Sequence, residues 1–444
     1  MIEKIRNIFQ VPELKRRILF TMALVVIDRL GEHLPTPGVN ARALAGAFAA
    51  SGAAGGLFGL YDLFVGGAFS RATIFALGIM PYISASIILQ LLGAVVPYYE
   101  KLRKEGEEGQ KKITQHTRFG TVLISFIQSY AYSVFLTNLG HSQGLPIVPS
   151  PGFLFTFSTI VTQTTGTILV MWLGEKITEH GIGNGISLII FINIVGRVPN
   201  TILSAFESLR GGSLSWPLYL TILAMMVGVI AAVILMTQAV RKIPVQYAKR
   251  VVGRRMYGGA NTHIPLRVNT AGVIPIIFAS SVMILPATVA GFVKADSPLA
   301  GLGQLFSRTG WIYNILYGLI IIFFTYFYTA VVLNPNDLAE NMRKHGGFVP
   351  GIRPGRKTAD YIDKVLSRIT LPGAIFLALI AVLPDLIIGA TNMPFMGFGG
   401  TSVLIVVGVA LDTIAQTEAH LVMRNYEGFY KNSKVKGRWF NVGQ

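Results

Sequence analysis

Apolar segments alternate with polar loops along the whole chain, and the apolar segments are long enough to cross a bilayer. Their length and low charge predict membrane-spanning helices rather than the helices of a soluble core. Ten such spans are predicted, at about 18–34, 72–96, 119–139, 153–173, 182–203, 216–239, 271–293, 311–333, 369–389 and 400–421. An even number of spans places both chain termini on the same side of the membrane.

The basic residues of the polar segments indicate the orientation in the membrane. Of the 38 Lys and Arg residues, 31 lie in the N-terminal segment, in the loops 97–118, 174–181, 240–268 and 334–368, and in the tail after residue 422. The loops on the opposite side hold five. Because Lys and Arg accumulate in cytoplasmic loops, both termini are predicted to be cytosolic.

Composition narrows the class of protein further. Of the 444 residues, 52% are hydrophobic and 13% are charged, whereas soluble domains carry about 25% charged residues. The chain has a net charge of +17 and no cysteine, which excludes disulfides, cysteine nucleophiles and thiolate metal sites. It contains no nucleotide-binding phosphate loop, no HExxH motif and no GxSxG motif. We therefore predict no cofactor, no metal site and no enzymatic activity.

A secondary transporter of a small solute is the alternative function for a protein with many spans. Ion-coupled transporters place ionisable groups in the middle of their spans, because the coupling ion needs a site. The predicted spans are nearly free of charge at their centres. Asp412 and Glu418 lie late in the last span, and we interpret them as the end of a helix that leaves the membrane. The transporter is therefore the weaker alternative.

Two cytosolic loops are too long to be plain connectors. Loop 240–268 holds seven basic residues and no acidic residue, and its alternating stretch IPVQYAKRVV predicts a strand. The glycine pair at 258–259 would allow a turn, so a hairpin is predicted. Loop 334–368 contains Gly and Pro residues that predict an irregular tip displaying Arg353, Arg356 and Lys357.

On the opposite side, the segment 43–71 is moderately apolar but too broken by glycine to form a good span. A short helix that folds back into a membrane protein is tolerated only where protein or water surrounds it. The segment is therefore consistent with a short helix that folds back into the protein and is surrounded by protein or water.

Branched aliphatic and small polar residues recur within the spans. Ile79 and Ile83 are four residues apart, as are Ile186 and Ile190, so each pair lies on one helical face. Such pairs are usually core or lipid-facing positions, but a ring of them at a central axis would close a pore by dewetting. Small polar residues also lie within the spans: Ser84, Ser86, Gln90, Gln128, Ser280 and Ser281. Such residues usually form packing contacts between membrane helices. The alternative is that they mark a seam between helices that can open toward lipid.

Several long segments, in the right order, resemble the SecY family, the central channel subunits of bacterial protein translocases. The most specific are FALGIMPYISASIILQLL at 75–92, KEGEEGQKKI at 104–113, MWLGEKITEHGIGNGISLIIF at 171–191, YAKRVVGRRMYGGANTHIPLRVNTAGVIPIIFASS at 247–281 and GGFVPGIRPGRKTADYIDKVLSR at 346–368. The resemblance covers nearly the whole chain.

The resemblance implies an all-α fold of ten transmembrane helices, in two inverted five-helix halves at 1–205 and 206–444 around an hourglass pore. It implies a pore ring of Ile79, Ile83, Ile186, Ile190, Ile277 and Ile405. It implies a plug at about 57–71, with Leu57, Phe58, Leu60, Tyr61, Leu63 and Phe64. It implies a lateral gate between spans 2 and 3 and spans 7 and 8, with Ser84, Gln90, Gln128, Ser280 and Ser281.

The resemblance also implies partners for the basic loops. The motor ATPase SecA and the ribosome, through its RNA phosphate backbone, are expected to bind Lys249, Arg250, Arg254, Arg255, Arg353, Arg356 and Lys357. SecE and SecG are the expected small subunits, with YidC and SecDF as further candidates. The cargo would be an unfolded preprotein with a signal peptide, and membrane segments would leave sideways into the lipid. The expected location is the bacterial cytoplasmic (inner) membrane.

Overall fold

The computed structural model of the chain describes residues 11–50, 57–144, 146–212, 215–247, 250–252, 255–257, 261–292, 310–391 and 400–432. Most of these residues are helical. The helices up to residue 210 are α2 (Pro12–Gly31), α3 (Ala41–Ala50), α4 (Leu57–Phe64), α5 (Met80–Val95), α6 (Pro97–Lys104), α7 (Glu107–Gln143), α8 (Phe153–His180), α9 (Gly185–Val195) and α10 (Val198–Arg210). They are followed by α11 (Trp216–Gln238), α12 (Ile274–Phe292), α14 (Trp311–Val332), α15 (Pro335–Lys344), α16 (Arg356–Thr391) and α17 (Gly400–Asn432).

Helices of membrane-spanning length lie where the apolar segments predict them. Within the described residues, seven helical stretches are long and apolar enough to cross a membrane, and α5 with α6 would add an eighth across a bend of 96°. The two remaining predicted spans coincide with α2, which carries Asp28 and Arg29 near its end, and with α12. Several helices run beyond their apolar segments, so the predicted loop 97–118 is helical for most of its length.

The predicted second span is wrong over its first eight residues. Helix α5 begins at Met80 and not at residue 72, and residues 65–79 form a succession of turns. Gly66, Gly67 and Gly78 have positive φ angles there, as does Ala72, and a helix cannot contain these conformations. The apolar side chains of this stretch are buried inside the protein, although the stretch is not helical.

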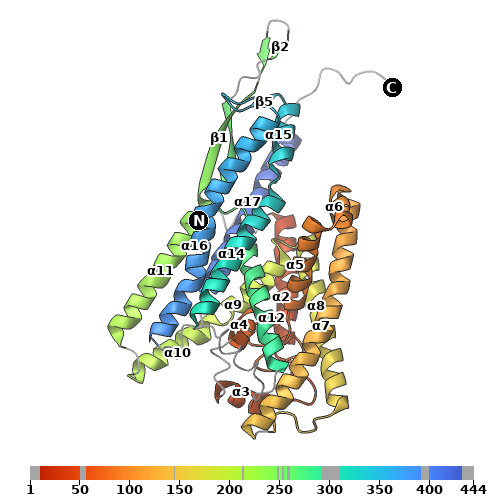
Figure 1. Ribbon diagram of the computed structural model, residues 1–444, viewed down its shortest axis with the longest axis vertical. Helices are drawn as coiled ribbons and strands as arrows, with labels where there is room; N and C mark the ends of the chain where they lie inside the picture. Colours follow the sequence, from red (N-terminus) through yellow and green to blue (C-terminus); the bar gives the residue numbers. More distant parts are fainter. Residues whose placement is uncertain are drawn as a thin grey trace.

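The helices form two groups that meet along two seams (Figure 1). In the first group, α8 packs on α2, α7 and α9, and α7 packs on α5. In the second group, α14 packs on α12 and α16, and α17 packs on α11 and α16. Helix α12 contacts α5 and α7 across one seam, and α17 contacts α9 across the other. The expected boundary between the halves, at residue 205, falls inside α10.

A small sheet projects from one end of the second group (Figure 1). Strand β1 (Val240–Tyr247) pairs antiparallel with β4 (Asn261–Arg267) and with the short β5 (Gly347–Phe348). Ile243 and Val245 are buried while their neighbours Lys242 and Pro244 are exposed, as the alternating sequence predicts. The buried face forms a second hydrophobic core with α15 and α16, made of Ile243, Val245, Leu266, Met342, Val349, Ile362 and Leu366.

The predicted hairpin is confirmed by the antiparallel pairing of β1 with β4. Between these strands, β2 (Arg250–Val252) and β3 (Arg255–Tyr257) also pair antiparallel, with Val252 opposite Arg255. Gly258 and Gly259, where the turn was predicted, lie outside the described residues.

We predict that Gly166→Ala destabilises the protein by about 2 kcal/mol, because a crowded core resists added atoms. A Cβ atom on Gly166 of α8 would lie 2.1 Å from the carbonyl oxygen of Ile74, which is backbone and cannot rotate away. The measurement is thermal unfolding in detergent followed by tryptophan fluorescence. The matched control is Gly93→Ala in α5, where an added Cβ meets nothing within 4 Å. Equal melting temperatures for the two variants would contradict this packing.

Candidate functional site

Four separate elements bring the six isoleucines of the expected ring to one hydrophobic core. Ile79 and Ile83 lie at the start of α5, where the Ile83 amide donates a hydrogen bond of 3.2 Å to the Ile79 carbonyl. Ile186 and Ile190 lie on α9, and the other two lie on α12 and α17. Five of the six are buried, and the half-buried Ile186 packs against the same core: Ile79, Ile83, Ile186, Ile190, Ile277 and Ile405. Both groups of helices therefore contribute to one apolar centre.

Helix α4 is seated at this centre, between the two groups of helices. It contacts α9 of the first group and α12 of the second. Tyr61, Leu63 and Phe64 are buried, so these residues of α4 are surrounded by protein. The side chains of three further expected plug residues lie outside the described part of the chain: Leu57, Phe58 and Leu60.

A buried carboxylate fixes the end of α4. The Asp62 side chain is 5% exposed, and its Oδ2 atom lies 2.7 Å from a guanidinium nitrogen of Arg197, which immediately precedes α10. The backbone amide and the hydroxyl of Ser70 also donate to Asp62, over 2.9 and 3.1 Å. The carboxylate is therefore compensated by three donors, as a charge removed from water requires.

Side chains also pair the backbone of the turns at 65–79. The Tyr61 hydroxyl donates to the Leu77 carbonyl over 2.9 Å, and the Tyr132 hydroxyl of α7 donates to the Phe69 carbonyl over 2.6 Å. The Asn193 amide of α9 donates to the Phe64 carbonyl over 3.2 Å. These bonds tie α4 and the following turns to α7 and α9.

The expected gate residues lie on α5, α7 and α12, the helices that meet at one seam. Ser84, Gln128, Ser280 and Ser281 are buried, and Gln90 is half-buried. Each serine of α12 donates to a carbonyl of its own helix, and Ser280 also lies 2.9 Å from the Tyr317 hydroxyl of α14. Within the described residues, no hydrogen bond joins Ser84 or Gln128 to the α12 serines. The helices that carry these residues therefore meet without a hydrogen bond between Ser84 or Gln128 and the α12 serines.

A direct polar bond joins α6 of the first group to α14 of the second group. The Arg103 guanidinium of α6 donates to the Val331 carbonyl of α14 over 2.6 Å. Val331 lies in the last turn of α14, where carbonyls lack helical partners and the helix dipole is negative. A cation is favoured there.

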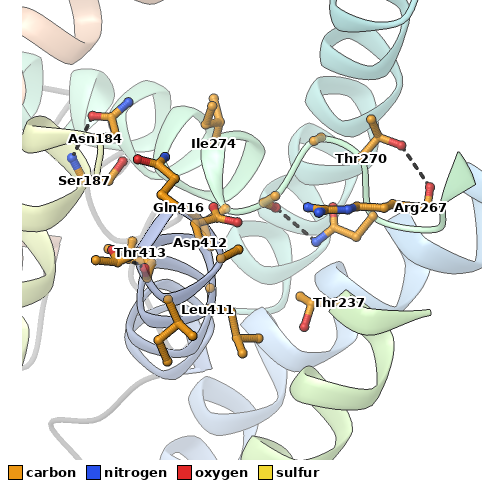
Figure 2. Close-up of a pocket in the computed structure, with 18 of the residues that line it drawn as sticks. Asn184, Ser187, Thr237, Arg267, Thr270, Ile274, Leu411, Asp412, Thr413 and Gln416 are labelled. Carbon is orange, nitrogen blue, oxygen red and sulfur yellow. Dashed lines mark hydrogen bonds between the residues drawn. The ribbon is translucent and has the colours of Figure 1, made fainter. Parts of the chain in front are cut away.

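A cavity of about 560 Å³ with several polar and charged lining residues opens beside the isoleucines (Figure 2). Its walls come from α9, α11, α12, α14, α17 and the end of β4. On α12, Ile274 in its wall lies one turn before Ile277, and on α17 Val409 lies one turn after Ile405. Figure 2 shows Asp412 of α17 facing this space, with Asn184 just before α9, Ser187 of α9 and Arg267 of β4 among the other residues around it.

The expected partner-binding residues are only partly described. Arg353, Arg356 and Lys357 are exposed at the tip before and at the start of α16. The Thr358 hydroxyl closes this tip with a hydrogen bond of 2.9 Å to the Arg353 carbonyl. Arg250 and Arg255 belong to β2 and β3, but their side chains are not described, and Lys249 and Arg254 lie outside the described residues.

Sequence reasoning did not single out several residues of the centre. Asp62 and Arg197 are 135 positions apart, and no pattern in the sequence pairs them. The only available signal was their charge, because a buried ionisable residue in a membrane protein needs a partner. Arg103 and Tyr132 were missed for the same reason. Asp412 and Glu418 do not mark a helix end, since α17 continues to Asn432.

These features define a multi-spanning helical membrane protein whose two groups of helices enclose an apolar centre and a buried short helix. Residues 73–414 match the family model of SecY. A protein translocase subunit SecY from Thermotoga maritima is 44% identical over 442 residues, which cover 99% of this chain and 100% of the relative. The Escherichia coli K12 relative of the same name is 46% identical over 428 residues, 96% of each chain. The chain belongs to the SecY family.

Solved structures support the fold. A protein-conducting channel superposes with a TM-score of 0.67 at 16% identity, over 93% of this chain and 94% of that chain. Sec61 in a canine ribosome–channel complex superposes with a TM-score of 0.61 at 16% identity, over the same shares. The arrangement of two helix groups is therefore that of known channels.

We predict that Asp62→Ala accelerates hydrogen exchange in residues 61–79. The variant leaves Arg197 and the Ser70 donors without their shared acceptor, at a cost of about 2 kcal/mol. Exchange measured by mass spectrometry in detergent checks this. Ser70→Ala is the graded control, because it removes one hydroxyl donor and keeps the ion pair, so its effect is expected to be smaller. Unchanged exchange in Asp62→Ala would show that this network does not hold the segment.

Proposed function

We propose that this chain is the protein-conducting channel of a translocase, which passes unfolded polypeptides across the membrane and releases membrane segments sideways into lipid. The observation that carries the proposal is the convergence of six isoleucines from both helix groups beside a buried short helix. The printed name of the relatives, protein translocase subunit, supports the same function. Catalytic chemistry is not part of the proposal.

The isoleucines suit a passage for cargo of variable chemistry. A ring of branched aliphatic side chains excludes hydrated ions by dewetting and offers no polar group to which a passing chain would adhere. In this proposal α4 and the turns after it are the plug, which blocks the passage at rest and moves when a polypeptide enters. Residues 1–205 and 206–444 then act as the two halves.

The lateral gate is proposed at the seam between α12 and the pair α5 and α7. Because the α12 serines bond to carbonyls of their own helix, separating the helices leaves none of these hydroxyls without a partner. Ser84, Gln90 and Gln128 would line the opposite side. The Arg103 bond to Val331 would break as the gate opens.

The energy for transport would come from partners. The exposed basic tip at Arg353, Arg356 and Lys357 suits a motor ATPase of the SecA type or the phosphate backbone of a ribosome. A structural neighbour was solved in a ribosome–channel complex, which supports ribosome docking. SecE and SecG are the proposed small subunits, and the proposed orientation in the inner membrane keeps both termini cytosolic.

Reconstitution tests the proposed function. The chain is incorporated into liposomes with a SecE-type partner, and SecA, ATP and a signal-bearing preprotein are added. Protection of the preprotein from external protease is expected to require ATP and this chain. A folded and correctly inserted complex that protects no preprotein, with either SecA or ribosomes as the driving partner, would contradict the proposal.

We predict that Ile83→Asn or Ile277→Asn makes the resting channel leak ions, because an amide in the ring stabilises water in the passage. Planar-bilayer conductance measures the leak. Ile276→Asn is the matched control, since Ile276 is a fully buried neighbour on α12 that is not in the proposed ring. Conductance equal to that of the wild type in both ring variants would remove the ring from the mechanism.

We predict that Arg353→Glu abolishes SecA-driven translocation while the protein remains folded and inserted. The side chain is exposed, and the tip is closed through the Arg353 backbone carbonyl, which the substitution leaves in place. Preprotein translocation and SecA binding are measured in parallel. Lys364→Glu makes the same charge reversal at an exposed position farther along α16 and is expected to retain transport. Normal translocation by Arg353→Glu would refute the contact.

A further inference from the structure

The plug segment, which comprises α4 and the turns at 65–79, is bound unequally to the two groups of helices. Its backbone carbonyls accept hydrogen bonds from the Asn193 side chain of α9 and from the Tyr132 hydroxyl of α7. Its buried carboxylate, Asp62, lies 2.7 Å from a guanidinium nitrogen of Arg197, which follows α9 in the chain. All three partners lie on, or directly after, helices of the first group.

The turns of the plug segment also pair with the chain that follows α2. The Thr36 amide donates to the Ala72 carbonyl over 2.8 Å. The Ile74 amide donates to the Leu34 carbonyl over 2.9 Å. The segment is therefore held to the first group through α4 and again through its last turns.

The contact with the second group is of a different kind. Helix α4 contacts α12, and its buried Tyr61 and Phe64 belong to the same hydrophobic core as Ile276, Ile277 and Phe278 of α12. In the parts of these elements that the structure describes, no hydrogen bond or ion pair joins α12 to the plug segment. This contact therefore depends on apolar packing alone.

An incoming polypeptide can replace one of these contacts but not the other. An apolar stretch of the polypeptide offers α4 the same burial and dispersion contacts that α12 offers at rest. It cannot replace the pair of Asp62 and Arg197, because separating the two charges leaves each without a partner in a poorly solvated site. Nor does it supply donors for carbonyls that lie outside a helix. Separation from α12 is therefore the less costly of the two.

We propose that the plug segment stays on the first group of helices when the passage opens, and that the transported polypeptide passes between α4 and α12. The side of α4 that contacts α12 at rest then becomes a surface for apolar stretches of the unfolded polypeptide. The plug moves relative to the second group and keeps its place on the first. This inference rests on the proposed function, because it assumes a polypeptide cargo.

Distances between spin labels test the proposal. The chain contains no cysteine, so pairs of cysteines can be introduced without removing any. The labelled positions are Gly59→Cys in α4, the exposed Asn138→Cys in α7 and the exposed Ile312→Cys in α14. The full chain with its natural membrane partners is placed in nanodiscs, and each labelled variant is first shown to transport. Electron–electron double resonance then compares the resting complex with one that SecA and ATP have filled with a preprotein stalled by a folded domain.

The stalled complex is expected to lengthen the distances from Ile312 to Gly59 and to Asn138, while the distance between Gly59 and Asn138 keeps its resting value. A longer distance between Gly59 and Asn138 in the stalled complex would overturn the proposal. Asp62→Asn removes the ion pair and is expected to permit that lengthening. Asp363→Asn removes an exposed carboxylate of α16 and is the matched control, expected to change none of the three distances.

Crosslinking supplies a second measurement on the unsubstituted chain. A photoreactive residue is placed in an apolar stretch of the stalled preprotein, and the crosslinked peptides of the channel are identified by mass spectrometry. Crosslinks to both α4 and α12 are expected. Crosslinks to α12 without any to α4 would overturn the proposed path, whatever the labelled variants show.

Failure of the proposed function would be visible separately. A wild-type complex that takes up no preprotein forms no stalled state, which would contradict the channel itself. A stalled state in which the plug segment has left the first group would contradict only the path between α4 and α12.

Discussion

Inside a membrane, backbone that is not helical must find hydrogen-bond partners within the protein, and this constraint organises the centre of the molecule. The turns at 65–79 cannot use a helical ladder for all their carbonyls. Tyr61, Tyr132 and Arg71 donate to carbonyls of this stretch, and Asn193 donates to the last carbonyl of α4. The segment and the helices around it therefore hold one another in place.

The same constraint explains why the contacts at the α12 seam and at the α4 anchor differ in kind. At the α12 seam the two α12 serines donate to carbonyls of their own helix, so they form no hydrogen bond to α5 or α7. At the α4 anchor, by contrast, a carboxylate and a guanidinium from distant parts of the chain neutralise each other. The first type of contact can separate at modest cost, whereas breaking the second strands a charge in a poorly solvated site.

The hydrophobic pattern predicted the positions of most helices because bilayer thickness sets a length that the sequence displays directly. It failed at residues 72–79, where apolar residues are buried in turns, because burial alone does not distinguish a turn from a helix. The isoleucine pairs at 79 and 83 and at 186 and 190 were visible as helical spacing, but their meeting with Ile277 and Ile405 depends on tertiary packing. The Asp62–Arg197 pair and the open Asp412 depend on the fold in the same way.

The second hydrophobic core has a mechanical consequence. It joins the hairpin rigidly to α15 and α16, while only residues 268–273 separate the end of β4 from α12. The hairpin therefore connects the second hydrophobic core to α12, the helix at the α12 seam. A force applied to the hairpin would be transmitted to α12 through this short connection, without a prior displacement of the apolar centre.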